Sequence, residues 1–192
     1  MTEPITSHLR AFLSLDLMDE TVRAKIKGIQ DVLMTAGADL KLVEPRNLHF
    51  TMAFLGEIDE NQKSFLCRRL ASAKLPPLTI SLRGVGAFPG PRKPRVVWVG
   101  VTKGKEDLER YASAALKMGI ESGVEVDQSE SFKPHLTVAR ARSLFGKENL
   151  SAKLESLVDA EVGESLTSPV RLKRSTLTPR GPVYETLCES SG

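Results

Sequence analysis

The sequence has few cysteines and few aromatic residues. Its 192 residues include only two cysteines, and aromatic residues make up 5% of the chain. Cys67 and Cys188 are far apart and match no spacing of metal ligands, and in a reducing compartment we expect both to remain thiols. Cysteine usage therefore gives no indication of a metal site.

Long apolar runs are also missing. No run approaches the roughly 18–20 apolar residues that a membrane helix needs. Residues 1–10, MTEPITSHLR, hold an acid and a proline where an export signal would need a basic start and an apolar stretch. We therefore expect a soluble protein with no membrane partner, which acts in the cytoplasm as a monomer.

The chain carries no strong charge of either sign. Lysine and arginine number 27 against 24 acidic residues, a net charge of +3. This small excess permits an anionic ligand but identifies none. With 41% hydrophobic and 27% charged residues, the composition is that of an ordinary globular protein and excludes a disordered or collagen-like chain. A chain of this length suits one compact domain or two small, closely packed lobes.

Short apolar runs and amphipathic stretches alternate along the chain. The patterns predict strands at residues 9–15, 40–43, 48–55, 78–82, 96–99, 124–126, 135–139, 169–177 and 184–187. They predict helices from Asp19 to about Gly37 and over residues 59–73, 106–121 and 147–159. Residues 84–94 contain three glycines and three prolines, which predicts a long loop and a boundary between two lobes.

The two halves of the sequence are related by a fixed offset. Phe12 and Trp98 are 98 − 12 = 86 residues apart, and so are His49 and His135, since 135 − 49 = 86. The order strand, helix, strand, histidine-bearing strand occurs in both halves. We therefore expect a single bilobal α+β domain over residues 1–192, duplicated internally with halves at about 1–83 and 95–192. Each lobe would be an antiparallel-rich sheet with helices on its outer side, around a central cleft that carries the two histidine strands.

Two of the three histidines begin similar tetrads, His49-Phe-Thr51-Met and His135-Leu-Thr137-Val. Alternate side chains of a strand share a face, so each histidine lies with the threonine two residues on, and the apolar residues between them turn to the core. Each strand thus presents an imidazole and a hydroxyl about 6.5–7 Å apart.

This set of groups suits acid–base chemistry at phosphorus. An imidazole has an ordinary pKa of about 6.5, so two of them can act as acid and base in one reaction. Threonine hydroxyls can hold the non-bridging oxygens of a phosphodiester. We expect no metal and no other cofactor, because the carboxylates near the tetrads show no repeated pattern. One such tetrad would be best explained by a structural histidine, whereas two at the repeat offset favour catalysis.

The tetrads and their flanks, NLHFTMAFLG (47–56) and FKPHLTVAR (132–140), resemble the two signature motifs of the 2H phosphoesterase superfamily. The closest resemblance is to the RNA 2′,3′-cyclic phosphodiesterases, also called 2′-5′ RNA ligases. The segments RAFLSLD (10–16), RVVWVG (95–100) and STLTPRGPVY (175–184) are similar to other recurring segments of that family, so the resemblance covers nearly the whole chain.

The resemblance implies a bilobal α+β fold and metal-independent hydrolysis of a 2′,3′-cyclic phosphate at an RNA end, which leaves a 2′-phosphate. It implies that His49 donates a proton and that His135 accepts one, with Thr51 and Thr137 binding the substrate. The family's second name adds reverse 2′-5′ ligation as an activity to consider.

Two further residues are candidates for substrate contact. The resemblance suggests that Arg140 contacts phosphate, but unbroken alternation would put it on the core face, so this role requires the strand to end or bulge near Ala139. Phe12 could stack on a base, as aromatic residues in this family segment do, or belong to the core of its strand. The basic clusters at residues 92–95 and 171–174 could attract RNA phosphates or be simple solvated surface.

Two rival functions stay open. One is a phosphodiesterase for another cyclic or 2′-5′-linked nucleotide, which differs in the shape of the cleft. The other is a catalytically silent RNA-binding module. The intact histidines and threonines in both tetrads argue against the second, since binding alone does not require two titrating groups.

Overall fold

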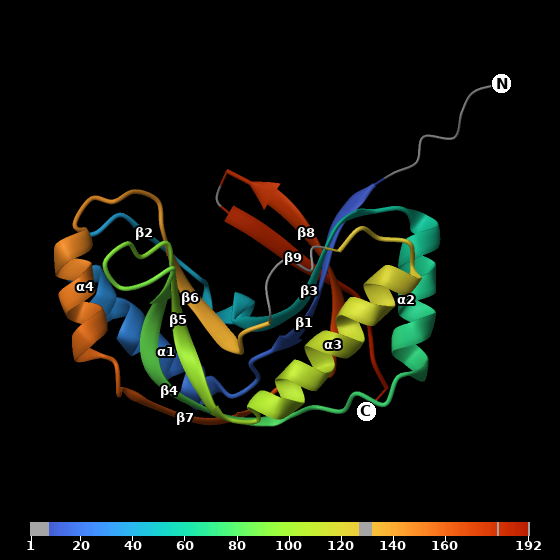
Figure 1. Cartoon of the computed structure of the whole chain (residues 1–192), viewed down its shortest axis with the longest axis horizontal. Coiled ribbons are helices and arrows are strands. Elements are labelled where there is room, and N and C mark those ends of the chain that lie inside the picture. Colours follow the sequence, from blue (N-terminus) through green and yellow to red (C-terminus); the bar gives the residue numbers. More distant parts are fainter. Residues whose placement is uncertain (1–7, 127–131, 180, 192) are drawn as a thin grey trace.

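The computed structural model describes residues 8–126, 132–179 and 181–191 and contains two antiparallel sheets (Figure 1). The first sheet has the strand order β3-β1-β8-β9 and the second β2-β6-β5-β4-β7. The strands are β1 (Leu9–Asp16), β2 (Leu40–Leu42), β3 (His49–Ile58), β4 (Thr79–Phe88), β5 (Val96–Lys103), β6 (His135–Ala141), β7 (Glu161–Leu166), β8 (Arg171–Thr178) and β9 (Gly181–Glu189). The helices are α1 (Glu20–Met34), α2 (Glu60–Ser72), α3 (Lys105–Glu121) and α4 (Lys147–Ser156), with a short 3-10 turn at Pro45–Asn47.

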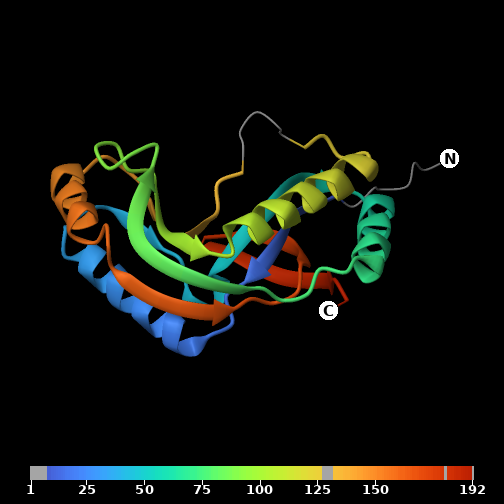
Figure 2. The same ribbon diagram turned by 60° about the horizontal axis from the view of Figure 1, so that its bottom comes forward.

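Each sheet is covered by helices on one side. Helices α1 and α4 pack together on the second sheet, and α2 and α3 pack on the first (Figures 1 and 2). Helix α1 buries the apolar stripe Val22, Ile26, Ile29 and Leu33 that predicted it, and its first turn is capped by the Asp19 side chain. The predicted α+β fold with helices on the outer side of two sheets is confirmed.

The sheets do not coincide with the halves of the sequence. The first sheet takes β1 and β3 from the first half and β8 and β9 from the end of the chain. The second sheet takes β2 and β4 from the first half and three strands from the second. Helix α1 follows β1 of the first sheet but packs on the second, whereas α3 follows β5 and packs on β3. Both sheets therefore depend on both halves of the chain.

The prediction of a loop from residue 84 to 94 is wrong over its first part, because β4 continues to Phe88. The glycine at position 86 has a packing role in that strand. A Cβ atom there would lie 2.4 Å from the Cη2 and Cζ2 atoms of Trp98 on the neighbouring strand, so only glycine leaves room for the indole ring.

Two short elements also differ from expectation. Residues 124–126 form no strand, and Val124 is instead buried after the end of α3. Strand β7 carries no strand signal in the sequence, because its six residues, EVGESL (161–166), do not alternate and include only two large apolar side chains. It pairs with β4 and extends the second sheet.

The expectation that both cysteines remain thiols is wrong. Cys67 of α2 and Cys188 of β9 form a disulfide with an S–S distance of 2.05 Å, across 121 residues of sequence. The bond attaches α2, one of the two helices that cover the first sheet, to β9, the edge strand of that sheet.

Buried hydrophobic residues form one core that includes residues of both sheets, among them Leu13 and Phe50 of the first and Val97 and Val138 of the second. No helix in the described ranges is long and apolar enough to span a membrane.

Candidate active site

The two tetrad histidines have the same backbone setting. His49 begins β3, His135 begins β6, and these two strands contact each other. The Nδ1 atom of His49 lies 2.6 Å from the carbonyl oxygen of Asn47, and Nδ1 of His135 lies 2.6 Å from that of Lys133. A carbonyl oxygen can only accept, so Nδ1 carries the hydrogen in both rings. Each Nε2 is therefore left to accept a proton when its ring is neutral, or to donate one when the ring is charged.

A bulge in β6 changes which residues share the face of His135. Val97 of β5 pairs with Ala139, but the next residue, Trp98, pairs with Thr137, so Val138 is an extra residue in β6. Val138 and Ala139 are consequently both buried, and Arg140 returns to the face of His135 and Thr137, where it is exposed. This is the bulge that a phosphate-contacting role of Arg140 requires.

Strand β3 has an equivalent bulge. Ala53 pairs with Leu13 of β1, and Thr51 pairs with Ser14, so Met52 is the extra residue. Phe54 therefore lies on the face of His49 and Thr51, with 65% of its surface exposed. Because 54 + 86 = 140, Phe54 occupies the position in its strand that Arg140 occupies in β6. Unbroken alternation predicts Phe54 on the core face with Phe50 and Met52, and this prediction is wrong because the bulge turns the ring outward.

Aromatic rings support both imidazoles. The His49 ring centroid lies 5.1 Å from that of Phe12 and 5.4 Å from that of Tyr184, and His135 lies 5.0 Å from Phe88. Phe12 is only 4% exposed, so it packs beneath the histidine and offers no open ring face for base stacking. Tyr184 of β9 received no role from the sequence, although its segment is one of those that carried the resemblance.

The hydroxyl groups on this surface are free to bind a ligand. Thr51 and Thr137 are half-buried on the faces of their histidines, and neither hydroxyl makes a hydrogen bond with the described residues. Ser14, opposite Thr51 in β1, is fully buried, and its hydroxyl likewise has no partner there. The hydroxyls of Thr51 and Thr137 can donate to phosphate oxygens without breaking an existing bond, whereas the Ser14 hydroxyl is enclosed by the protein.

The electrostatic setting involves both histidines and Arg140. Burial lowers the pKa of His49 and of His135 below the ordinary value, and the hydrogen bonds to the Asn47 and Lys133 carbonyls oppose this effect. The Arg140 guanidinium also lowers both values, so it lies within electrostatic reach of both rings. Arg140 forms no ion pair with the described residues and is available to an anion.

The second basic cluster of the sequence does not form an open rim. Arg171 and Lys173 bind the carboxylate of Asp16, and Arg174 binds Glu185 on the neighbouring strand. Lys173 is 5% exposed. In the first cluster, Arg92, Lys93 and Arg95 are exposed.

No set of three or more histidine, cysteine or acidic residues close enough to hold a metal ion occurs in the part of the chain that the structure describes. The groups that gather around the two histidines are hydroxyls, the Arg140 guanidinium, aromatic rings and an Asp16 carboxylate that Lys173 already binds. Such an arrangement suits proton transfer at an anionic substrate.

A family model described as LigT like phosphoesterase matches residues 15–98. The RNA 2′,3′-cyclic phosphodiesterase of Methanothermobacter thermautotrophicus is 40% identical over 185 residues, which cover 92% of this chain and 95% of that protein. The protein of the same name from Aeropyrum pernix is 38% identical, and the match covers 86% of this chain and 93% of that protein.

Solved structures share the fold. A crystal structure of a Thermus thermophilus protein is 30% identical and covers 95% of this chain and 97% of its own, with a TM-score of 0.75. Escherichia coli LigT, crystallised in complex with 3′-AMP, has a TM-score of 0.76 at 24% identity and covers 94% of this chain and 96% of its own.

Proposed function

This chain belongs to the LigT-like phosphoesterase family, together with RNA 2′,3′-cyclic phosphodiesterases, and from that membership we propose that it hydrolyses 2′,3′-cyclic phosphodiesters at RNA ends to 2′-phosphomonoesters. One observation carries the proposal. Two histidines lie on contacting strands, and the Nδ1 atom of each is hydrogen-bonded to the backbone carbonyl two residues before it, so both Nε2 atoms are available. Each histidine also shares its strand face with a free threonine hydroxyl.

The two imidazoles divide the proton transfers. His135, neutral at Nε2, accepts a proton from the attacking water, and His49, protonated at Nε2, gives one to the departing 3′ oxygen. The bond from phosphorus to the 3′ oxygen breaks, and the phosphate stays on the 2′ oxygen. After turnover His135 is protonated and His49 is neutral, so exchange with solvent restores the starting state.

The remaining groups bind charge and base. The hydroxyls of Thr51 and Thr137 and the guanidinium of Arg140 donate to the non-bridging oxygens, where negative charge grows in the transition state. Phe54, exposed on the same face as His49, offers a ring on which the terminal base stacks. Phe12 contributes by supporting His49 from below rather than by touching the base.

The test is product identification with the purified full-length protein. A cyclic mononucleotide and an oligonucleotide with a 2′,3′-cyclic phosphate end are incubated with and without EDTA, and phosphorus NMR assigns the products. We expect a 2′-phosphate at the same rate in both conditions. A 3′-phosphate product would reverse the assigned roles of the two histidines, and loss of activity in EDTA that a divalent ion restores would overturn the metal-independent mechanism.

Further substrates test the rival functions. A 2′-5′-linked dinucleotide tests the rival diesterase activity, and an RNA acceptor with a 5′-hydroxyl end tests reverse ligation. Binding of RNA without turnover of any of these substrates would favour the catalytically silent RNA-binding module.

We also propose that the protein acts as a monomer, because both tetrads of the site come from one chain. The equal Nδ1 hydrogen bonds and the bulges at Met52 and Val138, also 86 residues apart, support a single bilobal domain over 1–192 with an internal duplication. A cytoplasmic location, where RNA is processed, fits the proposed substrate. The disulfide is the one feature that a reducing cytoplasm would oppose.

A further inference from the structure

The two histidines share a backbone setting but differ in the charges beside them. The cross-strand partner of His49 is Asp16, whose side chain binds Lys173 of the next strand. The cross-strand partner of His135 is Gly100, which has no side chain. Among the residues that the structure describes, an ion pair therefore adjoins His49, to which we assign proton donation, and none adjoins His135.

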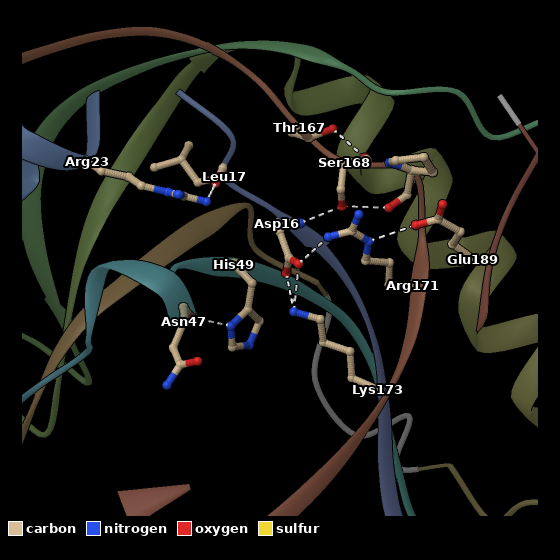
Figure 3. Close-up of polar contacts among 11 residues, drawn as sticks. Asp16, Leu17, Arg23, Asn47, His49, Thr167, Ser168, Arg171, Lys173 and Glu189 are labelled. Carbon is tan, nitrogen blue, oxygen red and sulfur yellow. Dashed lines mark hydrogen bonds and ion pairs between the residues drawn. The ribbon is translucent and has the colours of Figure 1, made fainter. Parts of the chain in front are cut away.

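The pair is buried, and further polar contacts surround the Asp16 carboxylate (Figure 3). The Lys173 Nζ atom lies 2.5 and 2.7 Å from the two carboxylate oxygens of Asp16, and the side chains are 6% and 10% exposed. Arg171 Nη1 donates to the same carboxylate at 2.8 Å and is itself held by Glu189. The Asp16 backbone N–H donates to the Ser168 hydroxyl, and its carbonyl accepts from the Ser168 N–H, both at 2.9 Å.

Stability alone does not explain this pair. Removing two charges from water is expensive, and apolar residues of similar volume at such sites are often at least as stabilising. The cost falls at a position directly beside a reacting group, where a fixed charge changes proton affinity.

We propose that the buried Asp16–Lys173 pair is a positioning device for His49, which distinguishes this imidazole electrostatically from His135 and keeps it in the proton-donating role. This inference rests on the proposed function for the assignment of that role, but its electrostatic part can be measured without substrate.

The charged and titratable groups around His49 come from four strands: Asp16 from β1, Lys173 and Arg171 from β8, Arg140 from β6 and Tyr184 from β9. Burial lowers the pKa of His49 most, the Lys173 ammonium lowers it further, and the Asp16 carboxylate raises it. For His135 only burial and Arg140 act in the lowering direction, and neither member of the pair contributes. The Lys173 ammonium has the larger effect, so the pair on balance lowers the pKa of His49, which makes its imidazolium a stronger acid.

Loss of one charge removes only one of two opposing effects, which gives the pair an unusual signature. In Lys173→Met the Asp16 carboxylate, which Arg171 still binds, raises the pKa of His49, and in Asp16→Asn the Lys173 ammonium lowers it. NMR titration of the imidazole Cε1–H signals of the free protein measures both values, and the variants His49→Ala and His135→Ala assign the signals. We expect opposite shifts for His49 and no shift for His135. The control Lys103→Met, which breaks an exposed pair with Glu164 on the second sheet, leaves both unmoved.

Breaking a buried pair is also destabilising, so a double variant is required. Asp16→Asn with Lys173→Met removes both charges and leaves no buried ion. We expect it to fold, to lose about tenfold in kcat and to change KM less than about twofold, because the donor and not substrate binding is disturbed. The matched surface double, Lys103→Met with Glu164→Gln, keeps both constants.

The outcomes separate this inference from the proposed function. The role of the pair is overturned if the pKa of His49 stays the same in both folded single variants or moves in the same direction in both. It is also overturned if the double variant folds and keeps the wild-type kcat across the pH range. If the wild-type protein is inactive on cyclic phosphate ends while His49 still shifts in opposite directions, the proposed function and the donor role fail together, and the electrostatic coupling of the pair to His49 stands.

Discussion

At the scale of single residues, each reacting imidazole is oriented by its own chain. The carbonyl two residues before each histidine accepts the Nδ1 hydrogen, so no side chain is needed to fix the tautomer. The aromatic rings beneath the imidazoles then restrict their tilt. Because this arrangement is complete without a ligand, the two Nε2 atoms are preorganised for a substrate placed between their strands.

Replacing either histidine tests this assignment. We expect His49→Ala and His135→Ala each to lower turnover at least about a hundredfold, since one general acid or base contributes on that scale. Steady-state rates on an RNA end with a cyclic phosphate measure the loss, and thermal melts check that both variants fold. The third histidine supplies the control: His8 is exposed and precedes β1, so His8→Ala keeps full activity. Near-normal turnover in either tetrad variant would contradict the two-histidine mechanism.

The pH dependence follows from the direction of the pKa shifts. Burial lowers the pKa of both His49 and His135 below 6.5 in the free protein. Productive encounters need one ring protonated and the other neutral, a state that is most populated between the two values and declines as pH rises above both. We therefore expect a bell-shaped profile of kcat/KM with its maximum below about pH 6.5, whose limbs belong to the coupled pair. A maximum above about pH 7.5 would contradict this prediction.

At the scale of elements, the two bulges decide what the histidine strands present. If the same residues formed regular strands without the bulges at Met52 and Val138, Phe54 and Arg140 would point into the core. With them, one strand adds an aromatic ring and the other a guanidinium to the face of its imidazole and hydroxyl. The same local device therefore gives the two strands different ligand groups, one suited to a base and one to a phosphate.

Arg140 has a well-matched control in Arg142, two residues further along. Arg142 is exposed just after β6 and faces Asp39 at 3.8 Å. We expect Arg140→Ala to lower kcat about 10²- to 10³-fold, as for the loss of one donor to a developing oxyanion, and Arg142→Ala to have little effect. Rates of both variants on the same cyclic phosphate substrate make the comparison. Equal losses would mean that general positive charge, rather than a directed contact, is what the strand supplies.

The sequence predicted the histidine strands well because their signal is local. Alternation placed His49 with Thr51 and Phe50 in the core, and the structure agrees. The bulges could not be read in the same way, because Met52 and Val138 are apolar residues that an unbroken strand would also bury. Alternation and the family resemblance therefore disagree about Arg140, and alternation wrongly places Phe54 in the core. The burial of Phe12 prevents the base contact for which it is a candidate.

At the scale of the whole molecule, long-range contacts decide features that no local pattern contains. Each sheet combines strands from both halves of the chain, so the repeat offset revealed equivalent elements but not their distribution between the sheets. The two cysteines show the same difficulty. Their separation of 121 residues matched no motif, and only the packing of α2 against β9 brings them together.

The disulfide gives a prediction for the stability of the entire fold. A bond that closes so long a loop restricts the unfolded chain strongly, and we expect its removal to lower the free energy of unfolding by about 2–4 kcal/mol. For a chain of this size that corresponds to a fall in Tm of about 5–15 °C.

Thermal melts of the wild type with and without a reductant, and of the double variant Cys67→Ser with Cys188→Ser, measure the effect. Turnover at 25 °C should change less than about twofold, because β1, β3 and β6 hold the histidines independently of the bond. The reductant should not affect the double variant, which controls for other actions of the reagent. A wild-type Tm that is the same in both conditions and equal to that of the double variant would show that the bond makes no contribution to folding stability.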